Sequence, residues 1–236
     1  DFRNHRIQKF DSSGNFLKGW GEKGKNHKEF DDPSGIGINN KTGEILIADT
    51  WNHRVQKFDS SGNFLLSIEK DFYGPRDVAI DSEDNIYICD TGNSEIKKFN
   101  SSGKFLLSWG GHGEGTSELL NPWGIAVSKD NEIYITDCGQ KKIKIFSSMG
   151  QFLREWNLSA YLEKNSEEMQ ICIEKEDIIV CDNINCIIMK FNKKGTLLKQ
   201  LNVLTPTGVA VTSGGELIYS EHDYHRLKIL LNWTHE

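Results

Sequence analysis

Carboxylates recur at a fixed place in this sequence. In six segments an acidic residue is followed nine positions later by an apolar one: Asp1/Phe10, Asp49/Phe58, Asp90/Phe99, Asp137/Phe146, Asp182/Phe191 and Glu221/Leu230. Carboxylates arranged around one axis could bind calcium, which prefers hard oxygen ligands. Each acid, however, ends a short apolar run, where its side chain can accept backbone N–H groups of the next loop. We therefore predict that Asp49, Asp90, Asp137, Asp182 and Glu221 are structural loop caps and that none is a metal ligand.

Histidines offer a second possible chemistry, zinc binding. His5, His53 and His225 occupy one position relative to the recurring acids, so a symmetric fold would separate them rather than bring them to one tetrahedral site. His222 and His225 are three residues apart, but no third ligand accompanies them. The sequence also contains no nucleophile elbow and no phosphate-binding loop. We predict no catalytic residue, no metal and no cofactor, and we do not expect an enzyme.

Composition narrows the classes of partner. The 236 residues carry a formal net charge of -6, with a pI near 5.7, which disfavours binding along a phosphate backbone. No apolar run approaches the roughly 20 residues that span a bilayer, so no membrane span is expected. The five cysteines show no CxxC spacing, and Cys89 and Cys181 directly precede an acid where other repeats have small residues. We interpret them as reduced core residues, with a disulfide or a metal site as alternatives.

The elements that position these residues follow from the repeat. Successive apolar ends of the pairs lie 39 to 48 residues apart, which is about the length of one four-stranded propeller blade. In residues 33–69, four short apolar segments are predicted as strands, at 35–38, 44–48, 54–58 and 64–68. The third segment, 54–58, alternates in polarity like a half-exposed strand, and the hairpin loop 59–63 contains a glycine that can adopt positive φ. We predict one all-β domain, residues 1–236, a β-propeller of four-stranded antiparallel blades.

The repeat resembles a known family. The segments Asn-His-Arg-Val (52–55), Asn-His-Arg-Ile (4–7) and Tyr-His-Arg-Leu (224–227) are similar to the signature of NHL repeats. The preceding proline–glycine strand and the following Ser-Ser-Gly-Asn hairpin also fit, and the match covers essentially the whole chain. This resemblance implies a ring with six blades, of which the first is incomplete because its two inner strands are missing. A ring of five, closed by pairing of the terminal strands, is the alternative.

Two functions found among NHL propellers can be tested on the residues. Peptidyl-hydroxyglycine α-amidating lyases resemble this architecture and bind zinc through histidines near the start of inner strands, where this chain has no histidine at 34–35, 76–77, 123–124 or 207–208. Some tripartite-motif proteins bind RNA through a basic face. Here the loops expected on one face carry more acidic than basic residues, so we do not expect a nucleic acid as the partner. Both functions stay as alternatives.

Aromatic residues in the loops indicate a third function, recognition of a protein or a peptide. Large aromatics are common anchors of binding surfaces. The candidate partner-binding residues, all placed in loops or at the start of an inner strand, are Trp51, Tyr73, Arg76, Asp77, Trp123 and Tyr224. Trp123 is expected beside the mouth of the propeller channel. The alternative is that these rings pack between blades. We predict a non-enzymatic binding or scaffold module for protein–protein interaction.

Overall fold

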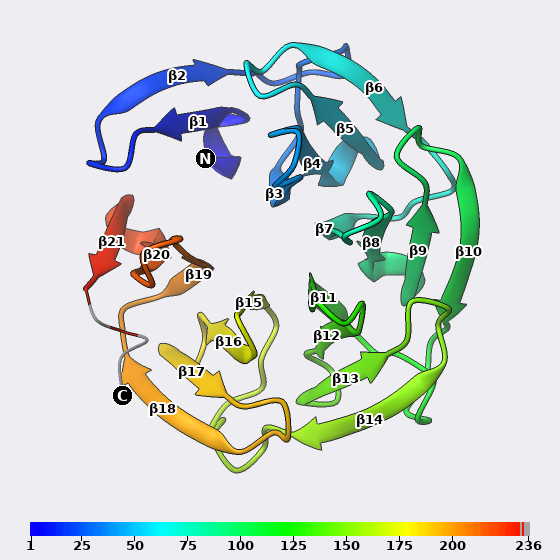
Figure 1. The fold of residues 1–236 in the computed structure, drawn as a ribbon, viewed down its shortest axis with the longest axis vertical. Helices are drawn as coiled ribbons and strands as arrows, with labels where there is room; N and C mark the ends of the chain where they lie inside the picture. The colour runs from blue at the N-terminus through cyan, green and yellow to red at the C-terminus, as the bar shows by residue number, and fades with distance from the viewer. Residues whose placement is uncertain (232, 234–236) are drawn as a thin grey trace. The chain divides into compact units, whose positions relative to one another are not determined.

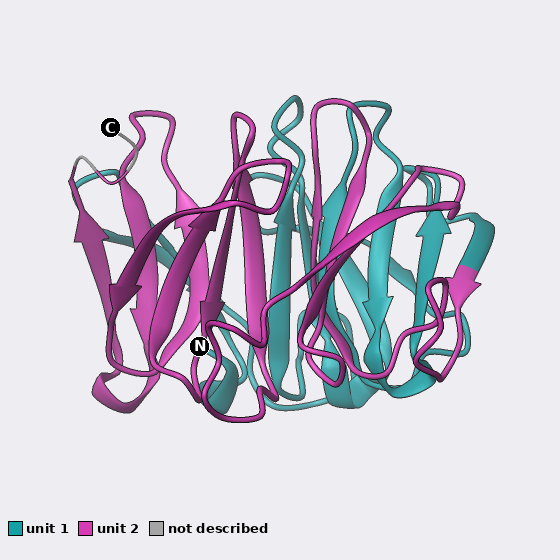
Figure 2. Cartoon of the chain, turned by 90° about the horizontal axis from the view of Figure 1, so that it is seen from below, with its two compact units in different colours: residues 1–108 teal, residues 109–236 magenta. Residues whose placement is uncertain are grey.

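The computed structural model describes residues 1–231 and 233. The chain divides into two compact units, residues 1–108 and 109–236, which Figure 2 distinguishes by colour. Each unit is built from antiparallel sheets and is described by itself. Apart from single 3-10 turns, the described residues form strands and loops, as the sequence predicts.

Unit 1 contains a two-stranded sheet followed by two four-stranded sheets (Figure 1). The first sheet consists of β1 (Ile7–Phe10) and β2 (Phe16–Trp20). The second runs in chain order through β3 (Pro33–Ile38), β4 (Ile45–Asp49), β5 (Arg54–Phe58) and β6 (Phe64–Ile68). The third repeats this order with β7 (Pro75–Ile80), β8 (Ile86–Asp90), β9 (Glu95–Phe99) and β10 (Phe105–Gly110), whose last residues extend past the unit boundary.

Unit 2 contains two four-stranded sheets and a three-stranded one. The first consists of β11 (Pro122–Val127), β12 (Ile133–Asp137), β13 (Lys142–Phe146) and β14 (Phe152–Asn157). The second consists of β15 (Met169–Glu174), β16 (Asp177–Asp182), β17 (Ile187–Phe191) and β18 (Leu197–Asn202). The last consists of β19 (Pro206–Val211), β20 (Leu217–Glu221) and β21 (Arg226–Leu230).

The third strand of a complete sheet is more buried than the sequence indicates. Residues 54–58 alternate in polarity and are predicted to be half exposed, but every residue of β5 is buried. The prediction is wrong because both faces of this strand are covered. The polar side chains on it are satisfied internally, as when the Lys57 ammonium contacts Glu44 at 2.8 Å and donates to the Ser101 carbonyl at 3.2 Å.

Neighbouring sheets within a unit pack through a constant pair of surfaces. Face A of a sheet carries the second-strand residues four and two positions before the acid, such as Ile86 and Ile88. Face B carries the residues three before and six after the acid, such as Leu46 and Val55. These four side chains meet in one buried cluster of unit 1. The hydrophobic core of each unit is therefore a series of contacts between face B of one sheet and face A of the next.

Tryptophans at the ends of outer strands lie against hairpin glycines of the next sheet. A Cβ on Gly195, which has φ +80°, would lie 2.7 Å from the Trp156 ring, and one on Gly62 would lie 3.2 Å from Trp20. Only glycine suits both the positive φ and this close approach. Trp20 and Trp156 are therefore packing residues.

Among the described residues, the first sheet contains two strands and the last sheet contains three. Each of the other four sheets has the strand order and antiparallel pairing of a propeller blade. In the described part of the chain, no helix is long and apolar enough to cross a membrane.

Candidate functional site

The loops that follow second strands have a common backbone form. In unit 1, β4 and β8 each end at their acid and lead into a single 3-10 turn, η2 (Thr50–Asn52) and η3 (Thr91–Asn93). The residue after each turn has left-handed φ, 53° at His53 and 55° at Ser94. The NHL histidine therefore occupies a helix C-cap in the left-handed conformation, where its side chain is fixed at the loop surface.

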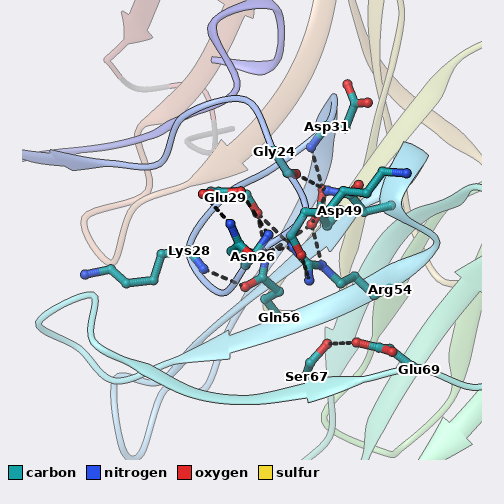
Figure 3. Close-up of polar contacts among 12 residues, drawn as sticks. Gly24, Asn26, Lys28, Glu29, Asp31, Asp49, Arg54, Gln56, Ser67 and Glu69 are labelled. Carbon is teal, nitrogen blue, oxygen red and sulfur yellow. Dashed lines mark hydrogen bonds and ion pairs between the residues drawn. The ribbon is translucent and has the colours of Figure 1, made fainter.

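Asp49 holds the loop in front of its own sheet (Figure 3). Its fully buried carboxylate accepts the Asp31 N–H at 2.7 Å and the Arg54 Nε–H at 2.7 Å. The rest of the Arg54 guanidinium donates to the carbonyls of Lys25 at 2.7 Å and Asn26 at 2.8 Å. One buried ion pair thus anchors the loop that precedes β3.

The other four acids predicted as loop caps are also buried and hydrogen-bonded. Asp90 accepts the Tyr73 N–H at 2.8 Å, and Asp137 accepts the Asn121 N–H at 3.1 Å. Asp182 accepts the Asn185 N–H at 2.9 Å, and Glu221 is paired with Arg226. These are capping contacts, but the capped loop differs from the predicted one. Asp49, Asp90 and Asp137 accept an N–H group of the loop before the inner strand. Only Asp182 accepts an N–H group, that of Asn185, from the loop after the acid, which is the loop that the sequence predicts for every acid.

Histidines of the repeat link one sheet to the loop of the next. His5 Nδ1 accepts the backbone N–H of Asp32 at 3.1 Å, and His53 Nδ1 accepts that of Gly74 at 3.1 Å. The two bonds are equivalent in the repeat. The sequence shows the recurrence of these histidines but not this role, because the accepted N–H groups lie 27 and 21 residues further along the chain.

One group of possible metal ligands occurs among the described residues: His5, Asp31 and Asp32. His5 Nδ1 lies 3.6 Å from an Asp31 oxygen and 4.0 Å from an Asp32 oxygen. The same nitrogen already accepts the Asp32 N–H, just as the His53 nitrogen accepts the equivalent Gly74 N–H in the next repeat. A metal would have to displace that bond, so the donor set fits a structural link better than a metal site.

Trp51 is exposed, but neighbouring side chains hold both its indole N–H and its ring. The side chain is 48% exposed, and its indole N–H donates to Asp32 at 3.0 Å. The Arg76 guanidinium lies 5.2 Å from the Trp51 ring centroid, within cation–π range. Since Asp32 precedes β3 and Arg76 is the second residue of β7, two sheets together hold this tryptophan in place.

Tyr73 lies next to this group and is 59% exposed. Its ring stacks on His53, with centroids 5.6 Å apart, and its backbone N–H is held by Asp90. Nearby, the hydrogen bond and charge of Lys70 lower the pKa of Asp71, so this exposed carboxylate stays ionised. We call Trp51, Tyr73, Arg76, His53 and Asp32 the unit 1 aromatic cluster.

The remaining predicted residues are placed differently. Asp77 is only 6% exposed, and its carboxylate accepts the Val78 N–H at 2.9 Å. Trp123 is partly buried and packs against the hydrophobic core of unit 2. Tyr224, also in unit 2, is exposed and lies 4.9 Å from the Arg226 guanidinium. The structure places the Arg76 guanidinium at the Trp51 ring and stacks Tyr73 on His53, which follows the same turn as Trp51. It places Asp77 and Trp123 mainly in packing positions.

Unit 2 has a groove of about 480 Å³ that contains none of the predicted residues. Its walls come from the loop after β14 and from the sheet β15–β18, and they include Tyr161, Lys164, Asn185, Cys186, Gln200 and Leu204. No residue pattern marks this groove, because its lining comes from three separate segments of the chain. No disulfide joins the five cysteines, and Cys89 and Cys181 are core residues as predicted.

Comparisons with known proteins agree with this architecture. The model of the NHL repeat matches residues 30–58, and a family model described as a 6-bladed beta-propeller matches residues 76–170. A search of curated proteins finds no match to the sequence.

Several solved structures share the fold. A streptogramin B lyase superimposes with a TM-score of 0.69 at 15% identity, over 96% of this chain and 73% of the lyase. A catalytically inactive virginiamycin B lyase from Staphylococcus aureus, with quinupristin, gives 0.68 at 15% identity, over 93% and 71% of the two chains. A selenomethionine-substituted form of that lyase gives 0.67 at 14% identity, with the same coverage. At these identities the likeness concerns the fold alone.

The protein is thus an all-β propeller of four-stranded antiparallel blades. One segment, residues 30–58, matches the NHL repeat itself, and the predicted resemblance to NHL-repeat propellers is confirmed. The first blade is incomplete, and the match to the six-bladed model agrees with the favoured count of six. This fold in general supports a binding or scaffold module.

Proposed function

We propose that this protein is a non-enzymatic recognition module that binds a protein or peptide through the unit 1 aromatic cluster. The observation that carries the proposal is the combination of exposure and fixation at Trp51 and Tyr73. A partner that covers these rings loses water from a large apolar area, while the protein loses little side-chain entropy because both rings are already held.

The charges around the cluster favour a polypeptide over a nucleic acid. Asp32 accepts the Trp51 indole N–H, the acidic residue Asp71 is two positions before Tyr73, and Arg76 already faces the Trp51 ring. Binding to a phosphate backbone needs several cations without nearby acids. A peptide can instead offer a side chain to the rings and backbone groups to the loops.

The test is selection of binding peptides from a displayed random library, followed by affinity measurements on variants. We expect selected peptides to bind Trp51→Ala and Tyr73→Ala at least about tenfold more weakly, since truncating a central aromatic anchor commonly costs 2 kcal/mol or more. Phe16→Ala is the matched control, because Phe16 is 58% exposed but lies on β2, away from the cluster. Peptides that bind all variants equally would place the recognition surface elsewhere.

An enzymatic alternative deserves one direct experiment, because the similar solved structures are named as lyases. The protein is incubated with quinupristin, with and without added divalent cations, and the products are separated by chromatography. We expect no turnover. Turnover that His5→Ala abolishes would instead support a lyase that uses the His5–Asp31–Asp32 group. RNA binding with steep salt dependence would favour the other alternative.

A further inference from the structure

The unit 2 groove lies where one sheet lacks a polar residue that the three other four-stranded sheets share. Seven positions after the acid, those sheets carry a side chain that donates to carbonyls of the loop before the inner strand: Gln56, Lys97 and Lys144. In the sheet β15–β18 this residue is Met189, which is buried and whose side chain has no donor. The loop 158–168 therefore has no such anchor, and a groove of about 480 Å³ lies between this loop, the turn after β16 and β18.

The groove is elongated and has an apolar floor. It continues into a second hollow of about 260 Å³, which shares Tyr161, Glu163 and Gln200 with the first. The apolar lining residues are Tyr161, Ile184, Ile187, Val203 and Leu204. All the lining residues lie between positions 159 and 204, within unit 2. Glu163 and Lys164 contribute opposite charges, so the groove suits a partly apolar ligand without a large charge.

β18 offers an unpaired strand edge beside this groove (Figure 1). It is the last strand of its sheet and, in the described part of the chain, pairs with β17 alone. The Val203 N–H donates to the Cys186 carbonyl at 2.9 Å, at the end of this pair of strands. Because hydrogen-bonded and non-hydrogen-bonded pairs alternate along an antiparallel ladder, Gln200 and Asn202 direct their backbone N–H and C=O groups away from β17. Their side chains line the groove, so the open edge and the groove are presented together.

The corresponding place on β14 is protected by charge. Glu155 has the register position there that Gln200 has on β18, and its carboxylate contacts the Lys142 ammonium at 2.5 Å. Charged side chains on an edge strand deter the addition of a further strand. β18 instead presents uncharged amides at Gln200 and Asn202, which leave its edge accessible.

We infer that the unit 2 groove binds an extended peptide segment, which pairs with the edge of β18 and places alternate apolar side chains on the groove floor. An extended peptide matches both features, because its backbone groups repeat at the spacing of a strand and its side chains alternate between two faces. A nucleic acid would need several uncompensated cations, whereas Lys164 directly follows Glu163 here. The site shares no residue with the unit 1 aromatic cluster.

The edge of β18 can be closed without a loss of bonds to β17. Gln200→Pro removes the backbone N–H that faces away from β17 and puts a proline ring in its place. Proline is tolerated on an edge strand where the N–H faces solvent. Ser67→Pro is the matched control, because Ser67 is opposite Gln56 in the register of β5 and β6, as Gln200 is opposite Met189.

The probes are linear peptides, selected from a displayed random library on the whole wild-type protein and depleted on Gln200→Pro. We expect them to bind Gln200→Pro at least about tenfold more weakly than the wild type, and Ser67→Pro as tightly as the wild type. N-methylation of the peptide backbone should weaken binding at alternate residues only, because every second N–H of an added strand faces β18. A maleimide adduct of Cys186, which lines the groove, should also block binding.

Three results would overturn the inference. The first is that no selected peptide distinguishes the wild type from Gln200→Pro or from the Cys186 adduct; if circular dichroism shows that the proline variant is unfolded, the adduct alone decides. The second is that the effect of N-methylation does not alternate along the peptide. The third is a concentration-dependent dimer that Gln200→Pro abolishes and Ser67→Pro retains, because a second copy would then be the occupant. The peptides should bind Trp51→Ala as tightly as the wild type, so this site and the proposed recognition surface stand or fall separately.

Discussion

Replacement of Arg54 by alanine tests how the propeller holds its loops. The change removes four hydrogen bonds, one to the Asp49 carboxylate and three to the carbonyls of Lys25, Asn26 and Glu29. It also leaves a fully buried carboxylate without its cation. Removal of one partner of a buried ion pair costs about 3–5 kcal/mol. We expect a loss near the lower end, about 3 kcal/mol, because amide groups of neighbouring side chains still donate to Asp49.

The assay combines urea unfolding with amide hydrogen exchange. Since the chain has two compact units, unfolding need not be two-state, and exchange at the Asp31 amide reports the local effect directly. Lys70→Ala is the control, because Lys70 pairs with Asp71 at the surface and such pairs contribute about 0–1 kcal/mol. If Arg54→Ala cost no more than Lys70→Ala and left exchange at Asp31 unchanged, the argument that this ion pair anchors the loop would be refuted.

Three further perturbations follow from packing and protonation. In the native protein, Cys186 should react first with a thiol reagent. Burial raises the pKa of the thiols of Cys138, Cys172 and Cys181, that of Cys172 to about 12. Mass spectrometry of labelled peptides identifies the reacting cysteine, and rapid labelling of a core cysteine would contradict the prediction. Gly35→Ala should lower the free energy of unfolding by about 1–3 kcal/mol, because the new Cβ would lie 2.5 Å from the Arg76 carbonyl oxygen. Gly208→Ala, where the nearest atom is 3.1 Å away, should cost less, and thermal unfolding compares the two. Burial and a hydrogen bond to Glu132 raise the pKa of Tyr134 to about 12 from 10.0, so the folded state keeps this proton while the unfolded state loses it. Stability should therefore fall between about pH 10 and about pH 12, and less steeply in Tyr134→Phe, as measured by urea unfolding across this range.

Local sequence was sufficient for the elements of the fold. The acid ending each second strand, the glycine of each hairpin and the apolar alternation in strands such as β4 and β8 depend on residues a few positions apart. The predicted strands at 35–38, 44–48, 54–58 and 64–68 therefore match β3 to β6 within two residues at each boundary. The recurrence of this unit was enough to predict the propeller and its incomplete first blade.

Tertiary structure decided which side chains meet. Trp51 and Arg76 are 25 residues apart, and their contact exists because two neighbouring sheets bring β7 beside the turn after β4. The burial of β5 likewise depends on the sheets on either side, which its own alternation does not reveal. Asp77 is a candidate by its place in the repeat, yet the structure buries its side chain.

The sequence by itself determined the repeat, the fold class and the kind of residue at each repeat position, because short-range backbone preferences and polarity set these. Only the tertiary structure decided which aromatics stay exposed and which loop N–H each acid accepts. Those properties depend on the packing of one repeat against another. The strand β5 shows this most directly, since its alternating polarity predicts half exposure while the structure buries each of its residues.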